Sequence, residues 1–373
     1  MRLLLLCGFH PAHNAVSSGP KIVAREIEAL EASGWEVVTV SFENEMDRRH
    51  LPHGFELPET AGSRIFSLTR KLRLLAALRH PLMPFAASVR PFVAKAYVKE
   101  LLANTCFDRI EIQAVQAAGI LPEKWRIKAN VVCQDVLTQS YDRQYEYARG
   151  LRRMLAGIER YKVRRWETKI LRSYGTITVL NTKDKRLVEI LTDRPDIEVR
   201  YPQVPGYIDP SERTTECLDP SMMLFWAHMA RMENVDAVHY FVRTMMPLIL
   251  AKCPRARFVV AGIDPPQSVR QLAGDSVTIT GYVKDPAHLF RSAAVGVVPL
   301  RLGAGIKIKT LEMIACGLPV IATSVGAEGV TADDLLTEVD DPETFAAAVI
   351  TQLMRANQCA TRLSTTVPTQ MAG

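Results

Sequence analysis

The sequence predicts an α/β protein with two doubly wound domains, in each of which helices cover a parallel sheet. Short apolar runs of strand length alternate with stretches whose apolar residues recur at helical spacing, a pattern typical of βαβ units. This alternation stops once, at a proline-rich stretch, and then restarts. The chain has 373 residues, 48% of them hydrophobic and 23% charged, which suffices for two domains of roughly 100 to 200 residues each.

The first domain opens with a strand, a turn-rich loop, a helix and a second strand. An apolar run at 3–7 is followed by a helical pattern at 21–32, which Gly34 ends before a strand at 35–42. A βαβ unit of this kind implies a parallel sheet that binds ligands at the carboxyl ends of its strands. Three more apolar runs predict further strands at 109–112, 130–133 and 176–180.

The second domain repeats this pattern after a linker. Residues 201–210 have a turn-rich composition, and a polar segment follows them. We therefore place the first domain at 1–205, the linker at 206–220 and the second domain at 221–373. Two such domains joined by a hinge usually hold a ligand in a cleft. In the second domain we expect strands at 222–227, 257–261, 277–279, 295–299 and 319–323, and helices at 235–250, 286–292, 307–316 and from Pro342.

Charge is spread unevenly along the chain. The formal net charge is +6, but residues 1–205 carry 32 Lys and Arg against 23 Asp and Glu, whereas residues 206–373 carry 14 against 17. This asymmetry points to an anionic partner for the first domain. One segment without any acidic residue, 61–99, holds Arg64, Arg70, Lys71, Arg73, Arg79, Arg90, Lys95 and Lys99.

A second basic segment, 149–172, has nine basic and two acidic residues together with an apolar stripe. Such a segment is most often a surface helix with its back to the core. Together with 61–99 it could instead form a face for an anionic membrane surface, because each basic residue near such a surface contributes about 1 kcal/mol. A nucleic-acid partner is not expected, since no RNP, helix-turn-helix or zinc signature accompanies the charge.

The seven scattered cysteines favour a reducing compartment. They form no Cys-x-x-Cys pair and have no His at metal-ligand spacing, so neither a disulfide framework nor a zinc site is expected. No stretch reaches the 18 or so uninterrupted apolar residues that would cross a bilayer. The apolar run at the start is interpreted as a buried strand rather than a signal peptide. We expect a cytoplasmic protein that is peripheral on the inner face of the membrane.

The stretch 299–323 is the most informative about chemistry. Gly303 and Gly305 follow a strand, and Lys307 and Lys309 lie at the start of the next helix. Free N–H groups already give a helix start a positive potential, so an anion such as phosphate is expected to neutralise these lysines. Glu312 shares roughly one helix face with Lys309 and is placed to accept hydrogen bonds from sugar hydroxyls. The alternative is a solvated helix with a Lys309–Glu312 ion pair.

The same residues resemble the donor-binding signature of retaining glycosyltransferase family 4, also called glycosyl transferases group 1. Residues 234–241, Asn-Val-Asp-Ala-Val-His-Tyr-Phe, are similar to the opening of the family's second domain. The likeness is strong over 222–347 and weaker in the first domain. The signature positions are Pro299, Arg301, Gly303, Gly305, Lys307, Lys309, Glu312, Gly317, Pro319, Gly326, Ala327, Glu328 and Gly329.

The resemblance implies the GT-B fold, in which two Rossmann-like domains face each other across a central cleft. It implies a nucleotide-diphosphate sugar as co-substrate, no further cofactor and no metal. Stabilisation of the departing diphosphate is the main catalytic contribution expected. The resemblance gives Glu312 the ribose hydroxyls and makes Lys307 and Glu312 the catalytic candidates. The implied donor-binding set is Arg301, Gly303, Gly305, Lys307, Lys309, Glu312 and Glu328.

Four residues of the first domain are candidates for the acceptor or donor-sugar side. His13 lies in the first loop and Gly19 at the following helix start, where ordinary loop and helix-start roles remain the alternatives. Gln134 and Asp135 follow a strand at a position where the family often has His-Asp. A Gln side chain can still bond a hydroxyl but cannot serve as an acid or base.

Two further departures from the family pattern bear on activity. Ala304 stands where many members carry the first Glu of an E-x7-E motif, and residues 356–373 are polar where members have a long closing helix. We therefore expect the closing helix to be short or the tail to be divergent.

These observations lead to one main hypothesis and two alternatives. The main hypothesis is a retaining glycosyltransferase of hexosyltransferase type that moves a sugar from a nucleotide-diphosphate donor to a glycan or lipid-linked acceptor. Its expected setting is the biosynthesis of cell-surface polysaccharide or glycolipid. One alternative is a catalytically silent partner of the same fold that binds glycan or lipid, favoured by Ala304 and Gln134. The other is a same-fold sugar-nucleotide epimerase or phosphorylase.

Overall fold

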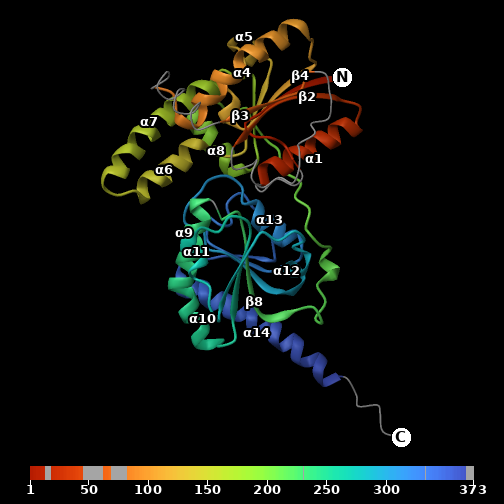
Figure 1. The fold of residues 1–373 in the computed structure, drawn as a ribbon, viewed down its shortest axis with the longest axis vertical. Coiled ribbons are helices and arrows are strands. Elements are labelled where there is room, and N and C mark those ends of the chain that lie inside the picture. Colours follow the sequence, from red (N-terminus) through yellow and green to blue (C-terminus); the bar gives the residue numbers. More distant parts are fainter. Residues whose placement is uncertain (13–17, 45–61, 69–81, 230, 332, 367–373) are drawn as a thin grey trace. The chain divides into compact units, whose positions relative to one another are not determined.

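The computed structural model describes residues 1–12, 18–44, 62–68, 82–229, 231–331 and 333–366. The chain divides into two compact units, with Gln203 closing the first and Val204 opening the second. Each unit contains its own parallel sheet with helices on both of its faces (Figure 1). The expected α/β class and its doubly wound sheets are thus confirmed.

The sheet of the first unit has the order β3-β2-β1-β4-β5-β6-β7 among the described strands, and every pairing is parallel. The central strand β1 is buried from Leu3 to Cys7, as a strand covered by helices on both sides requires. Leu3 pairs with Val37 on one side and with Arg109 on the other. The strands are β1 (Arg2–Cys7), β2 (Glu36–Asn44), β3 (Arg64–Leu68), β4 (Arg109–Gln113), β5 (Asn130–Cys133), β6 (Thr176–Val179) and β7 (Ile197–Val199).

The helices of the first unit differ in how the backbone N–H groups of their first turns are hydrogen-bonded. At the start of α8, the Asn181 side chain accepts a hydrogen bond from the Asp184 amide at 2.8 Å and forms a local cap. At the start of α6, Val136 offers no capping side chain. The described helices are α1 (Ser18–Ala32), α4 (Phe85–Asn104), the 3-10 turn Val115–Ala117, α5 (Glu123–Arg126), α6 (Leu137–Tyr147), α7 (Gly150–Arg172) and α8 (Thr182–Thr192).

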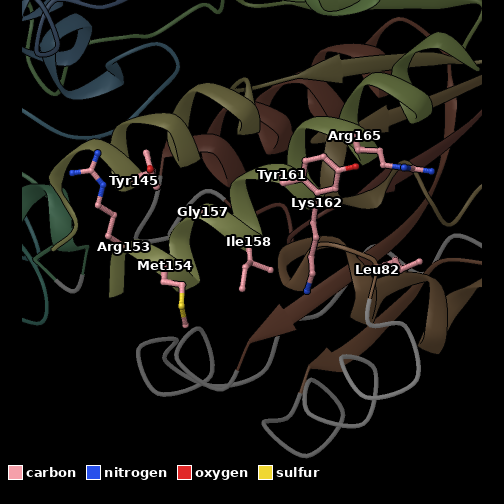
Figure 2. A pocket seen from close by; sticks show the side chains of 9 residues that line it. All are labelled: Leu82, Tyr145, Arg153, Met154, Gly157, Ile158, Tyr161, Lys162 and Arg165. Carbon is pink, nitrogen blue, oxygen red and sulfur yellow. The ribbon is translucent and has the colours of Figure 1, made fainter. Parts of the chain in front are cut away.

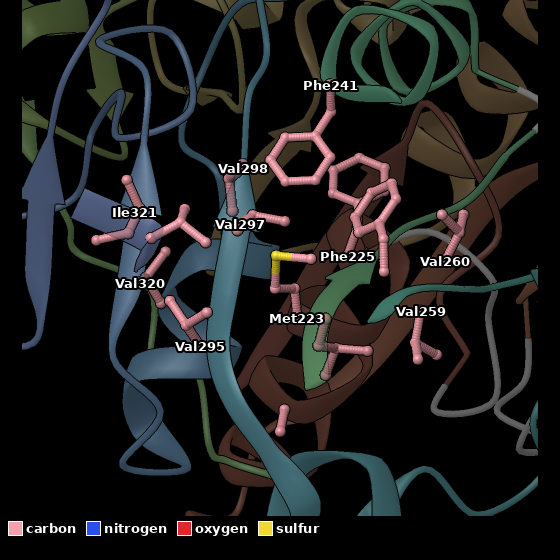
Figure 3. Close-up of a cluster of buried hydrophobic side chains, with 14 of the residues drawn as sticks. Met223, Phe225, Phe241, Val259, Val260, Val295, Val297, Val298, Val320 and Ile321 are labelled. Atoms are coloured by element: carbon pink, nitrogen blue, oxygen red, sulfur yellow. The ribbon is translucent and has the colours of Figure 1, made fainter. Parts of the chain in front are cut away.

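The second unit repeats the same topology with the strand order β10-β9-β8-β11-β12-β13 over its described residues, again wholly parallel. Its core lies between this sheet and its helices. The ring centre of Phe258 lies 6.5 Å from that of Phe225 on β8 and 4.4 Å from that of Phe241. Figure 3 shows Phe225 and Phe241 among apolar side chains of the neighbouring strands. The strands are β8 (Asp219–Trp226), β9 (Arg257–Ala261), β10 (Val277–Gly281), β11 (Ala293–Val298), β12 (Val320–Ala322) and β13 (Leu336–Glu338).

One long helical stretch of the second unit contains a widened turn. The helix expected at 235–250 is α9 (Met232–Tyr240) and α10 (Met246–Lys252), joined by a π-helical turn at Phe241–Met245. Pro247 lies just after this turn, and a proline without an N–H group accounts for the lost regular hydrogen bond. The other helices are the 3-10 turn Pro210–Glu212, α11 (Gln267–Arg270), α12 (Ala287–Ser292), α13 (Ile308–Ala315) and α14 (Pro342–Thr366).

Two expectations need correction. Strands β3, β7 and β13 were not expected from the sequence; they lie at sheet edges and are only three to five residues long. The polarity after Ala356 was expected to mean either a short closing helix or a divergent tail; α14 continues to Thr366, so the first of these is wrong. Its apolar side packs on the core as far as Ala356, and beyond that point the helix is polar and exposed where described.

Some sequence expectations fall outside the described residues. His13 is one of them, and so are Arg70, Lys71, Arg73 and Arg79 of the basic segment 61–99. Within the described parts of the chain, none of the helices combines the length and the apolar character needed to cross a lipid bilayer.

Candidate functional site

The topology itself marks a place for a ligand in each unit. In a doubly wound sheet, ligands bind outside the carboxyl ends of the strands where the strand order reverses. In the second unit this reversal lies between β8 and β11. Residues 227–229 follow β8, and residues 299–307 follow β11; the second segment belongs to the stretch 299–323 that the sequence singled out.

The loop 299–307 needs both of its glycines for its conformation. Gly303 has φ of +111° and Gly305 has φ of +72°, values that other residues rarely adopt. They follow strand β11, which is buried throughout, and precede α13, which begins at Ile308. The loop is therefore held between a rigid strand and a helix start. A glycine loop that leads into a helix start is a common place for an anion to meet backbone N–H groups.

Lys307 forms a buried ion pair at the start of α13. Its Nζ donates to Oε2 of Glu328 at 3.0 Å, with the two side chains 8% and 4% exposed. The Lys307 amide also donates to the Glu328 carbonyl oxygen at 3.0 Å. The loop that carries Glu328 is fixed to the same helix, because the Thr310 hydroxyl donates to the Gly326 carbonyl oxygen at 2.7 Å. Two signature residues, 21 positions apart, thus meet at one point.

Lys309 lies two residues further along the chain and contacts α9. Its Nζ donates to the Asn234 side-chain oxygen and lies 5.1 Å from the centre of the Phe225 ring. Asn234 is itself held, since its amide donates to the His228 carbonyl oxygen at 2.7 Å. Burial lowers the pKa of Lys309 to about 7, against the opposing effect of the nearby Glu233 carboxylate. This amine therefore changes charge near neutral pH.

Arg301 is held by α9 in a two-point contact. Its Nε and Nη2 donate to the two carboxylate oxygens of Asp236 at 3.0 and 2.6 Å. The guanidinium also lies 4.2 Å from the centre of the Tyr240 ring. A planar guanidinium suits both contacts in a way that an ammonium group does not. The arginine is about 38% exposed, so one side of it still reaches solvent.

Glu312 lies on α13 and is 7% exposed. Its Oε1 accepts a hydrogen bond from the Tyr207 hydroxyl at 3.2 Å, and the Tyr207 amide donates to the Cys316 sulfur at 3.1 Å. Tyr207 comes from the segment that the sequence analysis assigned to the linker. The structure thus gives this tyrosine a definite place beside the carboxylate, as a hydroxyl that orients it.

In the first unit, the structure brings together Gly19 and Gln134. A Cβ atom on Gly19 would lie 2.5 Å from Oε1 of Gln134, so the helix start of α1 closely approaches the end of β5. Nε2 of Gln134 also donates to Oε1 of Gln113 at 3.4 Å, and Asp135 follows directly in the chain. His10, from the same first loop, is buried and shares a 3.0 Å hydrogen bond with the Ser41 hydroxyl.

Several partners of the site escaped the sequence analysis as individual residues. Asn234 and Asp236 stood in the motif 234–241, but nothing in their spacing indicated that they bond Lys309 and Arg301. Glu233 and Tyr207 carried no signal at all. The residues are 65 or more positions from their partners, so only the parallel topology reveals these contacts.

A separate surface runs along the first half of α7. Leu151, Met154, Leu155 and Tyr161 are each more than half exposed, whereas Ile170 near the other end is buried in the core. The expected apolar stripe therefore turns to solvent over this half of the helix. A groove of about 720 Å³ lies along it, lined by Leu82, Tyr145, Arg153, Met154, Gly157, Ile158, Tyr161, Lys162 and Arg165 (Figure 2). We call this the α7 surface.

Among the described residues, no cluster of three or more His, Cys, Asp or Glu side chains has the arrangement of a metal site. The charged groups at the switch point of the second unit are instead lysines, an arginine and carboxylates in pairs. What this arrangement can offer a ligand is backbone amides, ammonium groups and a buried carboxylate.

The two Rossmann-like units define the chain as a protein of GT-B fold, and solved structures agree. A TarM variant from S. aureus, solved with fondaparinux, alpha-GlcNAc-glycerol and UDP, has a TM-score of 0.63 at 9% identity, over 96% of this chain and 94% of that one. HepE from Anabaena in complex with UDP gives 0.58 at 11%, over 98% and 99%. The α,α-trehalose 6-phosphate synthase from Burkholderia multivorans gives 0.57 at 13%, over 97% and 94%.

Family comparison adds to this fold. Residues 222–355 match the family model described as Glycosyl transferases group 1, and this range includes the loop 299–307. A search of curated protein sequences gave no match to this chain. The resemblance drawn from the signature residues is therefore supported by the family model over residues 222–355, and the GT-B fold is confirmed by the solved structures.

Proposed function

We propose that this protein is a retaining glycosyltransferase, of hexosyltransferase type, that moves a sugar from a nucleotide-diphosphate donor to a glycan or lipid-linked acceptor. The observation that carries the proposal is the coincidence of two findings. The stretch that matches the glycosyl transferases group 1 model is the one that places lysines, glycine amides and a buried carboxylate at a switch point. Structures of similar fold that contain UDP, such as those of TarM and HepE, support a nucleotide donor.

The donor site would use the second unit. The Glu312 carboxylate, oriented by the Tyr207 hydroxyl, accepts hydrogen bonds from the ribose hydroxyls of the donor. The amides of the loop at Gly303 and Gly305, together with Lys309, hold the diphosphate. Asn234 keeps the Lys309 ammonium in place before the donor arrives.

Lys307 contributes although it is already paired. An ammonium group has three N–H donors, and Glu328 takes one of them at Oε2. On this proposal the Lys307 ammonium group also stabilises negative charge as the diphosphate leaves. Stabilisation by such preorganised positive groups is commonly the largest single term in catalysis. On this proposal the reaction proceeds without a metal ion or a further cofactor. The transferred sugar keeps the anomeric configuration that it has in the donor.

The first unit would receive the acceptor and face a membrane. Gln134, Asp135 and Gly19 form the candidate acceptor or donor-sugar side of this unit. The α7 surface combines exposed apolar side chains with basic groups, which is the composition of helices that lie in a lipid interface. We place the enzyme in the cytoplasm, peripheral on the inner membrane face, in the biosynthesis of polysaccharide or glycolipid of the cell surface.

Titration calorimetry with UDP, GDP and TDP, followed by turnover with the matching sugar nucleotides, tests this function. We expect one nucleotide to bind and the corresponding donor to be consumed. Lys307→Ala and Glu312→Ala should each reduce turnover by about 100-fold or more while circular dichroism stays native, since each removes a group that acts on the donor. Unchanged turnover in both variants would contradict the assignment.

The same experiment separates the second candidate. Ala304 and Gln134, which replace a Glu and a His of the family pattern, favour a silent glycan-binding or lipid-binding partner. Such a partner would bind none of the three nucleotides. An epimerase would consume the donor without an acceptor and without releasing nucleotide.

The membrane contact has its own test. Sedimentation with vesicles should show binding that depends on anionic lipid and that rising salt releases, because the basic groups act through screened charges. Leu155→Ser, on the exposed face of α7, should weaken sedimentation, whereas Ile190→Ser on exposed α8 should not. Equal binding to neutral vesicles at high salt would argue against an anionic surface.

A further inference from the structure

We propose that Glu167 is a positioning residue that holds the Gln134–Asp135 loop in place by capping helix α6 from the neighbouring helix α7. Its Oε1 accepts a hydrogen bond from the Leu137 amide at 2.9 Å, and its Oε2 accepts from the Thr138 amide at 2.7 Å and the Thr138 hydroxyl at 2.5 Å. The inference rests on the proposed function, because that function gives the loop its role at the acceptor or donor-sugar side.

The cap is unusual because it comes from a distance of about 30 residues along the chain. Helix α6 has no cap of its own, since Val136 at its start carries no polar side chain and its first turn has no acidic residue. Helix α8 of the same unit shows the ordinary solution, in which Asn181 caps from the adjacent position. The start of α6 is therefore fixed by α7 rather than by its own sequence.

The loop that this cap controls is only three residues long. Strand β5 ends at Cys133 and α6 begins at Leu137, so residues 134–136 have both ends fixed. Gln134 is held on one side by Gln113 at 3.4 Å and lies against Gly19. The other end depends on the hydrogen bonds to Glu167. A shift in the first turn of α6 would thus move the side chains of Gln134 and Asp135 directly.

Fold stability alone does not account for a carboxylate at this position. Glu167 is fully buried, and burying a charged carboxylate is unfavourable unless hydrogen bonds offset it. Burial raises its pKa to about 7, the hydrogen bonds from Thr138 and Leu137 oppose this rise, and Asp135 adds to it. Glu167 in turn interacts with the Cys133 thiol, whose pKa burial raises well above its usual range. Burial thus disfavours the ionised form of this carboxylate, which lies next to the candidate site at Gln134 and Asp135.

Two variants separate positioning from stability. Glu167→Gln keeps the shape but offers only one acceptor oxygen, and Thr138→Val removes one of the three hydrogen bonds without touching the buried charge. The matched control is Glu189→Gln, which makes the same chemical change on α8, where Glu189 faces Lys185 at 3.8 Å. Each purified full-length variant is examined for unfolding temperature, hydrogen exchange in peptides covering 134–140, and steady-state kcat and donor KM.

We expect the amides of Leu137 and Thr138 to exchange at least 10-fold faster in Glu167→Gln, with peptides of β5 and of the α7 core unchanged. The value of kcat should fall about 10-fold to 100-fold while donor KM stays within about twofold. In the wild type, kcat should fall as pH drops through about 7, because protonation removes the charged acceptor, and the variant should lack this step. Thr138→Val should show the same pattern with a smaller fall, and Glu189→Gln should behave as wild type.

The opposite outcomes are equally clear. Unchanged exchange at 137 and 138, or faster exchange with an unchanged kcat, overturns the positioning role. If Glu167→Gln does not fold, Thr138→Val decides: a wild-type kcat in that variant overturns the inference. If the wild-type enzyme turns over no donor at all, the proposed function fails, and the exchange data alone then decide whether Glu167 fixes the loop.

Discussion

The two units arrange their charged groups in different ways. In the second unit, three cations of the signature each contact a different side chain: Lys307 contacts Glu328, Lys309 contacts Asn234, and Arg301 contacts Asp236. These pairs lie around a loop at the carboxyl ends of strands. In the first unit, one carboxylate, Glu111, collects many partners in the middle of a strand.

The network of the first unit spans several strands. Glu111 is 1% exposed and lies on β4 with Arg109 and Gln113, which share its side of the sheet by the two-residue period. Oε1 of Glu111 accepts from Arg200 at 3.2 Å and from Gln113 at 2.9 Å, and Oε2 accepts from Asn130 at 3.1 Å. Burial alone would raise the pKa of Glu111, but Arg200 and Arg109 lower it overall.

Neighbouring Glu26 shows the opposite balance. Burial and the charge of Glu111 raise its pKa, although Arg200 lies 2.7 Å away and opposes the rise. The first-unit network therefore gathers several charged and polar groups around one carboxylate, whereas the second unit has separate pairs around a loop. We infer that the network serves stability and that the pairs serve a ligand. The predictions below test this division, beginning with the largest effect.

The largest effect is expected at Lys307, which could serve either the stability of the fold or the binding of a ligand. Lys307→Met leaves the nearly inaccessible Glu328 carboxylate without its cation, which costs about 3 to 5 kcal/mol of unfolding free energy. Adding Glu328→Gln to this variant removes the buried carboxylate charge. The double variant should therefore regain most of the lost unfolding free energy. Urea unfolding, followed by hydrogen exchange in α13, measures both.

The double variant then separates the two roles of Lys307. If the lysine serves the donor, the double variant folds as well as wild type but turns over donor about 100-fold more slowly. A double variant that regains both stability and turnover would show that Lys307 is purely structural, and the division between the units would not hold at this residue.

A smaller loss of stability, without loss of binding, is expected in the first unit. Arg200→Met removes one cation from the Glu111 network, and Arg109, Gln113 and Asn130 still bond the carboxylate. We therefore expect a cost of about 2 kcal/mol, below that of stranding a buried charge altogether. Nucleotide affinity should stay within about twofold by calorimetry. The control is Arg194→Met, whose partner Asp196 is mostly exposed. A large loss of affinity in Arg200→Met would contradict the structural role.

The stretch 299–329 could be predicted from the sequence much better than the Glu111 network, for a physical reason. The signature residues 299–329 lie close together in the chain, so their loop, helix and glycines could be predicted, as could most strands of both sheets. The Glu111 network could not, because its members come from separate strands and meet only through the parallel register, as Glu111 does with Asn130. The cap from Glu167 was hidden in the same way, since a helix with a basic pattern gave no reason to single out its buried acid.

A tenfold effect is expected from pH at Lys309. Its pKa of about 7 means that the cation, the form that attracts a diphosphate, becomes the minor form as pH rises above 7. Nucleotide diphosphate should therefore bind about 10-fold more weakly at pH 8.5 than at pH 6.5, with uptake of a proton on binding. Calorimetry in buffers of different ionisation enthalpy measures both. Lys309→Arg should remove the pH dependence, because arginine stays charged. The same pH dependence in Lys309→Met would assign it to another group.

The smallest effect is expected at Arg301. The experiment tests whether this residue takes part in ligand binding. Its guanidinium is committed to Asp236 by two bonds and rests on Tyr240. Because the pair is partly exposed, breaking it should cost at most about 1 kcal/mol of stability. If the arginine only braces α9 against the loop, Arg301→Gln and Asp236→Asn should weaken nucleotide binding equally, by less than about threefold, and the double variant no further. If instead Arg301 touches the donor, Arg301→Gln alone will weaken binding well beyond Asp236→Asn, since only that variant removes a positive charge from the ligand side.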